Sequence, residues 1–175
     1  NAAVRLVASV VVPSYQAAGT IEDCLRSILM QQTNFPFEIL VVDSSTDATP
    51  KLIRQRFPDV RLEHVDERLL PGQARNRGAA LAQADILVFI DADCIAADGW
   101  LAQHIREHRN GAVAVGGSID NAHPWSLISI AEYFLEFREY SKWARRRLTR
   151  MSPTCNFSVR LEQFQCAGGF PDLRA

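Results

Sequence analysis

The fold of this chain is decided by one stretch, Ile86-Leu87-Val88-Phe89-Ile90-Asp91-Ala92-Asp93-Cys94. Its first five residues form a short run of branched and aromatic side chains, which predicts a strand buried on both faces. Two carboxylates follow at the end of the strand, where an open α/β sheet places its ligands. Asp91 and Asp93 fit a divalent cation beside a phosphate-bearing ligand. The alternative is that Asp91 caps the next turn and Asp93 is solvated.

Composition describes an ordinary globular protein. The 175 residues amount to about one domain, with 47% hydrophobic and 22% charged residues and a net charge of −1. The near-neutral balance argues against nucleic acid as the main partner. No secretory signal opens the sequence, and no apolar run reaches the length of a bilayer span. The cysteines lack any Cys-x-x-Cys pair, so we expect reduced thiols in a cytoplasmic protein: Cys24, Cys94, Cys155 and Cys166.

Short apolar runs alternate with amphipathic segments in the first part of the chain. We expect strands over residues 4–12, 37–42, 60–65 and 86–90, with helices between them that include residues 21–29, 49–57 and 72–83. This alternation predicts βαβ units and a mostly parallel sheet. Later we expect a strand over 112–119, a long helix over 126–140 with an apolar stripe, a strand over 154–160 and a short helix over 161–167.

Four polar segments gather around the predicted carboxyl ends of the strands. They are Pro13-Ser14-Tyr15-Gln16, Asp43-Ser44-Ser45-Thr46-Asp47-Ala48-Thr49, Gly72-Gln73-Ala74-Arg75-Asn76-Arg77-Gly78 and Asp91-Ala92-Asp93. Each segment alone fits ordinary turn chemistry. Their order and spacing together are specific.

This set resembles the family-2 glycosyltransferases, inverting enzymes that use nucleotide-diphospho-sugars. The resemblance covers residues 7–170 and is strongest over 10–94; Thr154-Cys155-Asn156-Phe157-Ser158-Val159-Arg160 and Gly168-Gly169-Phe170 match the second half of the family. It implies a three-layer α/β/α GT-A (Rossmann-like) fold with a mostly parallel central sheet. It also implies a single domain over residues 1–175, with a nucleotide-binding half (1–94) and part of an acceptor-side half (95–175).

The resemblance implies a role for individual residues. Those assigned to the nucleotide are Pro13, Ser14, Tyr15, Asp43, Arg75, Asp91 and Ala92. The Tyr15 ring would stack on the base. Asp43 would accept the imino N–H of the base, which favours a UDP-sugar. Asp93, with Asp91, would bind the Mg²⁺ or Mn²⁺ that bridges the two phosphates.

Two of these segments also have local interpretations. Arg75 is assigned to the phosphates by the resemblance, but an arginine at that place in a helix is often a surface or ion-pair residue. Thr46 and Asp47 match the loop of the family, yet we expect them to accept hydrogen bonds from backbone N–H groups at the start of the helix over 49–57.

The general base does not appear where the resemblance puts it. In the family it is the aspartate of an acidic pair soon after Gly-Gly-Phe, whereas here only Pro171-Asp172-Leu173-Arg174-Ala175 follow. Asp172 lies too close to Gly169 to match. We therefore expect the base beyond Ala175, so that this chain binds the donor but transfers sugar poorly.

A basic run follows the predicted long helix: Lys142-Trp143-Ala144-Arg145-Arg146-Arg147-Leu148-Thr149-Arg150. It is either a solvated loop or a contact with anionic lipid headgroups or a lipid-linked acceptor. The second interpretation would put the protein at the inner face of the cell membrane. The acceptor, a saccharide or a lipid-linked molecule, is left open.

Two rival functions and one rival site are weighed against this prediction. A sugar-nucleotide pyrophosphorylase would need a Gly-rich phosphate loop after the first strand, where the chain has Pro13-Ser14-Tyr15. A non-catalytic nucleotide-sugar-binding domain would keep the pocket without the chemistry. His104, Glu107 and His108 spell a zinc-peptidase pattern, but no third ligand is evident, so we expect the two histidines on the protein surface.

Overall fold

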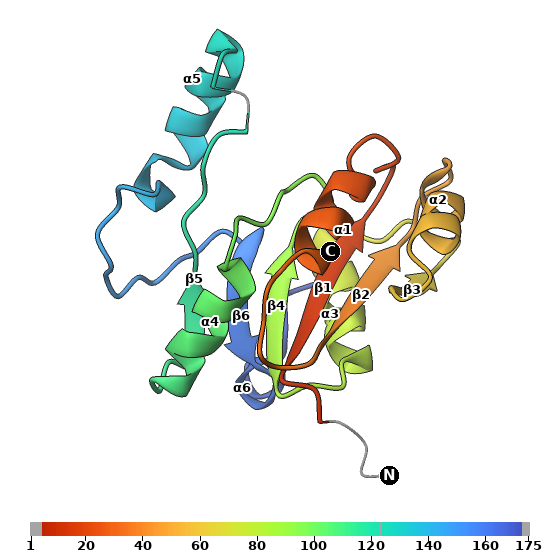
Figure 1. The fold of residues 1–175 in the computed structure, drawn as a ribbon, viewed down its shortest axis with the longest axis horizontal. Coiled ribbons are helices and arrows are strands. Elements are labelled where there is room, and N and C mark those ends of the chain that lie inside the picture. The colour runs from red at the N-terminus through yellow and green to blue at the C-terminus, as the bar shows by residue number, and fades with distance from the viewer. Residues whose placement is uncertain (1–4, 123, 173–175) are drawn as a thin grey trace.

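A six-stranded sheet forms the centre of the computed structural model, which describes residues 5–122 and 124–172. Its order is β3-β2-β1-β4-β6-β5 (Figure 1). Four neighbouring strands are parallel: β1 (Ala8–Ser14), β2 (Phe37–Asp43), β3 (Arg61–His64) and β4 (Ile86–Ile90). The strand β6 (Asn156–Arg160) runs antiparallel to both β4 and β5 (Ala114–Gly116). The predicted mostly parallel sheet is confirmed.

Helices cover both faces of this sheet, because successive side chains of a strand point to opposite sides. Val10 and Val12 pack with α1 (Ile21–Leu29), α2 (Thr49–Arg56) and α4 (Trp100–Arg109). Val11 packs on the other face with α3 (Pro71–Leu81) and α6 (Leu161–Cys166). The two buried clusters give the three-layer α/β/α architecture that the sequence predicts.

The strand β4 lies between β1 and β6, and all five of its residues are buried. Phe89 contacts three phenylalanines from the end of the chain, with ring centroids 5.6 to 6.4 Å away: Phe157, Phe164 and Phe170. These contacts fix the strand whose end carries Asp91 and Asp93.

The helix α3 approaches β1 unusually closely at Gly78. A Cβ atom at this position would lie 2.3 Å from Cγ1 of Val11, which no real contact tolerates. Glycine therefore allows α3 to lie directly on the strand, and this sets the position of the amino end of the helix beside the pocket described below.

The region after β5 differs from the predicted long helix over residues 126–140. It contains α5 (Leu127–Glu136) and a separate 3₁₀ turn, η1 (Arg138–Tyr140), and it projects away from the sheet (Figure 1). The apolar stripe is present but unburied: Leu127 is 84% exposed and Leu135 is 86% exposed. No residue of α5 is buried. Within residues 5–122 and 124–172, no helix is long and apolar enough to cross a membrane.

Candidate functional site

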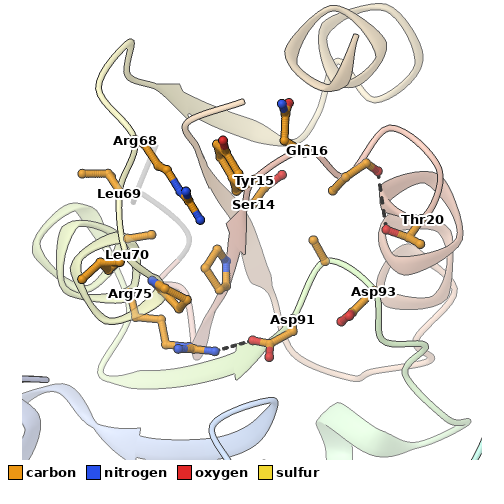
Figure 2. Close-up of a pocket in the computed structure, with 15 residues that line it drawn as sticks. Ser14, Tyr15, Gln16, Thr20, Arg68, Leu69, Leu70, Arg75, Asp91 and Asp93 are labelled. Carbon is orange, nitrogen blue, oxygen red and sulfur yellow. Dashed lines mark hydrogen bonds and ion pairs between the residues drawn. The ribbon is translucent and has the colours of Figure 1, made fainter. Parts of the chain in front are cut away.

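The carboxyl ends of β1 and β4 and the start of α3 enclose a cavity of about 440 Å³ (Figure 2). Most of the predicted site residues meet on its wall. Its lining consists of Pro13, Ser14, Tyr15, Gln16, Ala17, Thr20, Arg68, Leu69, Leu70, Pro71, Ala74, Arg75, Asp91, Ala92 and Asp93. The structure thus brings together every predicted site residue except Asp43.

Arg75 and Asp91 form an ion pair across the floor of this cavity (Figure 2). Arg75 is therefore the ion-pair residue that one interpretation of the sequence expected, but at 5% exposure it is buried and does not lie on the surface. Its Nε is buried without a hydrogen-bond partner among the described residues. A buried guanidinium needs a counter-charge, and Asp91 supplies it, which leaves Asp93 as the carboxylate without such a partner.

Asp93 is exposed and lies on the side of the cavity near Thr20, the residue before α1 (Figure 2). Among the described residues, no cation lies within ion-pair distance of its carboxylate. Burial, together with the charges of Asp93 and Asp91, raises the pKa of the Cys24 thiol to about 12. The turn after β4 is therefore a centre of negative charge. Two carboxylates there suit a hard divalent cation whose remaining ligands come from phosphate and water, although the described residues contain no group of three metal-ligating side chains.

Tyr15 is 41% exposed at the mouth of the cavity, and the Arg68 guanidinium carbon lies 4.4 Å from the centre of its ring. This stacking covers one face of the tyrosine. A planar ligand that stacks on the same face must displace Arg68 or insert between the two side chains.

Asp43 does not line the cavity, and it is completely buried. Its oxygens accept hydrogen bonds from Ser45 Oγ at 2.6 Å and Ser45 N at 3.2 Å, and Oδ2 lies 2.8 Å from Nδ1 of His64. Ser45 Oγ in turn accepts a hydrogen bond from the backbone N–H of Gln16, next to Tyr15. In this structure Asp43 thus positions the loop that carries Tyr15.

In the loop after β2, Asp47 has the local role expected from the sequence, whereas Thr46 does not: its Oγ1 accepts a hydrogen bond from the Gln16 side chain at 3.2 Å. Asp47 Oδ1 accepts hydrogen bonds from the backbone N–H of Thr49 at 2.9 Å and from its hydroxyl. Desolvation alone would raise the pKa of Asp47, but the bonds from Thr49 and Ala18 outweigh it and lower that pKa. Gln16, whose φ is +52°, accepts backbone hydrogen bonds from Thr46 and Asp47 and so joins the two loops.

Two thiols lie beside the turn that holds Asp91 and Asp93. A hydrogen bond between the side chains of Cys94 and Cys155 raises the pKa of Cys94 and lowers the pKa of Cys155. Cys94 Sγ is also 3.6 Å from Oδ1 of Asp93. No sequence motif links these cysteines, which are 61 positions apart.

The prediction that His104 and His108 lie on the surface is wrong. They are 3% and 1% exposed, because β6 inserts beside α4 and offers polar partners. Ser158 Oγ lies 2.8 Å from Nδ1 of His104 and 2.8 Å from Nε2 of His108. The outer nitrogens of the two rings face oxygens, Oδ1 of Asn156 and the carbonyl of Ala112.

Four contacts in this series need four protons, whereas two neutral rings and one hydroxyl supply three. A neutral pair therefore leaves one contact without a proton. Burial is the larger influence and lowers the pKa of His104 to about 4. The pKa of His108 is also lowered, first by burial. These histidines form a structural link between α4 and β6, and no third metal ligand joins them among the described residues.

Sequence reasoning missed one whole wall of the cavity, formed by Arg68, Leu69 and Leu70. These residues belong to the loop between β3 and α3 and carry no motif. Pro71 could have drawn attention to this loop, since proline is common at the first position of a helix and the amino end of a helix suits anions.

Comparison with known proteins identifies the family. The model described as glycosyl transferase family 2 matches residues 9–167. Glycosyltransferase AglE of Haloferax volcanii is 28% identical over 174 residues, which covers 94% of this chain and 56% of that protein. Validoxylamine A glucosyltransferase of Streptomyces hygroscopicus subsp. jinggangensis is 32% identical over 138 residues, which covers 72% of this chain and 32% of that protein.

Solved structures share the fold. Mannosyltransferase PcManGT from Pyrobaculum calidifontis, in complex with GDP-Man and Mn²⁺, has a TM-score of 0.70 and 29% identity, covering 95% of this chain and 48% of that chain. TarS of S. aureus in complex with UDP-GlcNAc has a TM-score of 0.68 and 21% identity, covering 95% and 49% of the two chains. The chain thus spans about half, or less, of these relatives. Because the family model spans most of the sequence, this chain belongs to glycosyl transferase family 2.

Proposed function

We propose that the cavity binds a nucleotide-diphospho-sugar through a divalent cation, and that the protein transfers the sugar to an acceptor with inversion. One observation carries this proposal: Asp93, without a cationic partner among the described residues, lines the same cavity as the exposed ring of Tyr15 and the buried Arg75. An aromatic face, a guanidinium and an unneutralised carboxylate match a base, a diphosphate and a metal ion, respectively.

The base is assigned to the end of the cavity formed by Pro13, Ser14 and Tyr15. Tyr15 stacks on the base after Arg68 moves from the ring. Asp43 reads the base edge only if the ligand replaces one of its present hydrogen-bond donors, Ser45 or His64. The sequence prediction favours uracil, whereas the mannosyltransferase relative at 29% identity is complexed with GDP-Man. Uridine and guanosine diphosphates are therefore both candidate ligands of this cavity.

The diphosphate is assigned to the opposite end, beside Ala92 and the start of α3. Arg75 and the positive end of the α3 helix dipole favour negative charge there. Asp93 and Asp91 would hold Mg²⁺ or Mn²⁺. When bound, this cation supplies Lewis-acid stabilisation of the departing diphosphate. Arg75 pairs with Asp91 and holds its carboxylate at the cavity floor.

The two halves of the chain are assigned different roles. Every residue that lines the cavity lies between positions 13 and 93, in support of a donor half at 1–94 and an acceptor-side half at 95–175.

The general base that deprotonates the acceptor hydroxyl is assigned outside the cavity lining, and Asp172 is not that base. Its Oδ1 accepts a hydrogen bond from Gln73 at 2.9 Å.

Calorimetric titration with UDP, GDP and TDP, each with and without Mn²⁺, tests the proposal. We expect one nucleotide to bind only with metal, and Asp93→Asn to weaken that binding at least about tenfold because it removes a charged metal ligand. Asp59→Asn is the matched control, since it removes the same exposed charge just before β3, at the opposite end of the sheet. Metal-independent binding, or equal losses in both variants, would contradict the assignment. Binding without any transfer or hydrolysis would favour the rival non-catalytic domain.

A peripheral membrane contact at the cytoplasmic face is proposed for the projecting region. Its apolar side chains are exposed, with Trp143 at 83% and Leu148 fully so. Lys142, Arg146 and Arg147 pair with acidic residues, so the basic run is partly neutralised. Arg145 and Arg150 have no ion-pair partner among the described residues.

Co-sedimentation with phosphatidylserine liposomes tests this contact. We expect wild-type protein to bind, and both R145E/R146E/R147E and W143S/L148S to lose binding, because basic and apolar contacts act together at such surfaces. Unchanged sedimentation of both variants would exclude the contact.

A further inference from the structure

The segment after α6 folds back onto α3. Phe170 follows two glycines of positive φ, Gly168 at +80° and Gly169 at +73°, which turn the backbone after the helix. The side-chain amide of Asn76, in α3, forms two hydrogen bonds with the backbone of Phe170. Its Nδ2 donates to the Phe170 carbonyl at 2.8 Å, and its Oδ1 accepts from the Phe170 N–H at 2.9 Å. A helix residue thus holds a segment that lies 94 positions later in the sequence.

The ring of Phe170 lies between other aromatic rings and the guanidinium of Arg75. Its centroid is 5.6 Å from that of Phe89 and 5.3 Å from that of Phe164. The guanidinium carbon of Arg75 lies 5.7 Å from the centre of the Phe170 ring, within the range of a cation–π contact. Gly72 permits this approach, because a Cβ atom there would lie 3.3 Å from Cβ of Phe170. The ring is therefore a packed support for Arg75.

Arg75 needs such a support because Asp91 holds only one end of its guanidinium. Among the described residues, Asp91 accepts a hydrogen bond from Nη2, and Nε is buried without a partner. One contact leaves the guanidinium plane able to turn about it. The ring of Phe170 restricts this rotation, and the Asn76 amide fixes the ring. Neither Phe170 nor Asn76 lines the cavity, so both act on a ligand there only through Arg75.

We propose that Asn76 is a positioning residue for Arg75: it holds Phe170 against the guanidinium and so keeps Arg75 directed at the diphosphate end of the cavity. That Arg75 meets a diphosphate rests on the proposed function, whereas the support of its guanidinium does not. The alternative is that Asn76 only attaches the segment after α6 to α3. A mere attachment affects the binding of every part of a ligand alike, whereas a positioning role affects the charged part more than the base.

The two glycines before Phe170 offer a matched pair of variants. Both have positive φ, so alanine strains the backbone at either position. A Cβ atom at Gly169 would lie 2.7 Å from Oδ1 of Asn76, whereas a Cβ atom at Gly168 meets nothing within 4 Å. Gly169→Ala therefore displaces the Asn76 amide, and Gly168→Ala is its control. Asn76→Leu removes both hydrogen bonds and keeps a side chain of the same branched shape.

The Nε–H signal of Arg75 in heteronuclear NMR spectra of the ligand-free chain tests the support itself. The signal is identified as the arginine resonance that is missing from Arg75→Gln. We expect Asn76→Leu and Gly169→Ala to shift and broaden it, because the guanidinium gains freedom. Gly168→Ala should leave it as in the wild type. An unchanged signal in Asn76→Leu and Gly169→Ala would overturn the proposal, whatever the protein binds.

Calorimetric titration in the presence of Mn²⁺ tests the consequence for binding. The two ligands compared are the nucleoside diphosphate that binds the wild-type chain, UDP or GDP, and its nucleoside without phosphate. We expect Asn76→Leu and Gly169→Ala to weaken binding of the diphosphate about tenfold and of the nucleoside less than about twofold, because only the diphosphate needs an oriented Arg75. Equal losses for the two ligands would overturn the positioning role. A wild-type chain that binds neither ligand would instead contradict the proposed function, and the NMR result would still decide whether Asn76 supports Arg75.

Discussion

The sheet with its covering helices and the projecting region after β5 differ in the burial of their apolar side chains. Every residue of β4 is buried, whereas no residue of α5 is, although both sequences are rich in apolar side chains. In the sheet, apolar residues find partners on both faces and so define a rigid frame for the cavity. In α5 the helical pattern is satisfied locally, but the apolar side chains face outward. The pattern of apolar residues therefore predicts whether a segment forms a helix or a strand. Whether its apolar side chains are buried depends on the other elements that pack against it.

A matched pair of phenylalanine substitutions gives the largest expected contrast. Phe89→Ala removes a fully buried ring in contact with three others, and we expect a loss of about 3–5 kcal/mol in the free energy of unfolding. Phe134→Ala, in α5, removes a ring that is 57% exposed and should cost less than about 1 kcal/mol. Urea denaturation measures both. Similar losses would mean that α5 is buried in solution.

Stability should also depend on pH through the buried histidines. Burial lowers the pKa of His104 from 6.5 to about 4 in the folded protein. The folded state therefore excludes a proton that the unfolded state binds, so stability is intact above pH 6.5 and is lost as the pH falls towards 4. At about 1.4 kcal/mol per pKa unit, the loss approaches about 3 kcal/mol.

Urea denaturation of wild type and His104→Gln between pH 4 and 7 isolates this effect, since carboxylates contribute equally to both proteins. The pH dependence of the variant should be shallower over that interval. The same pH dependence in both proteins would show that His104 is protonated in the folded state. A protonated His104 would supply the fourth proton that the contacts of the two histidines need.

Two substitutions of Tyr15 distinguish stacking of its ring on the base from a hydrogen bond made by its hydroxyl group. We expect Tyr15→Ala to weaken nucleotide binding about tenfold and Tyr15→Phe to leave it nearly unchanged, because stacking of a base on an aromatic ring contributes about 1–3 kcal/mol. Calorimetry with the nucleotide that binds wild type gives both values. A large loss in Tyr15→Phe would assign the contribution to the hydroxyl group instead.

The smallest effect is expected at Asp172. Its carboxylate accepts a hydrogen bond from Gln73 at the edge of α3, so Asp172→Asn should change nucleotide binding and any sugar transfer less than about twofold, as for most surface substitutions. A radiolabelled-sugar transfer assay measures the second quantity. Robust transfer by wild type that disappears in this variant would make Asp172 the general base.

The sequence predicted β4 to the residue, because a buried strand flanked by turn residues has sharp limits. It also placed Asp91 and Asp93 at the end of that strand. It did not predict the burial of His104 and His108, since their partners Asn156 and Ser158 come from β6, about 50 residues later. The Arg68 wall and the contact of Cys94 with Cys155 were missed for the same reason: each depends on long-range packing and leaves no local pattern.

Amide NMR of the chain with its nucleotide and Mn²⁺ tests the central claim most directly, because the paramagnetic ion broadens signals only near where it binds. The account predicts that the amide signals of residues 91–94 and 14–16 lose intensity, that those of Asp59 and α5 keep theirs, and that Asp93→Asn removes the effect. Broadening centred elsewhere, or broadening that persists in Asp93→Asn, would contradict the assignment of this cavity as a metal-dependent donor site.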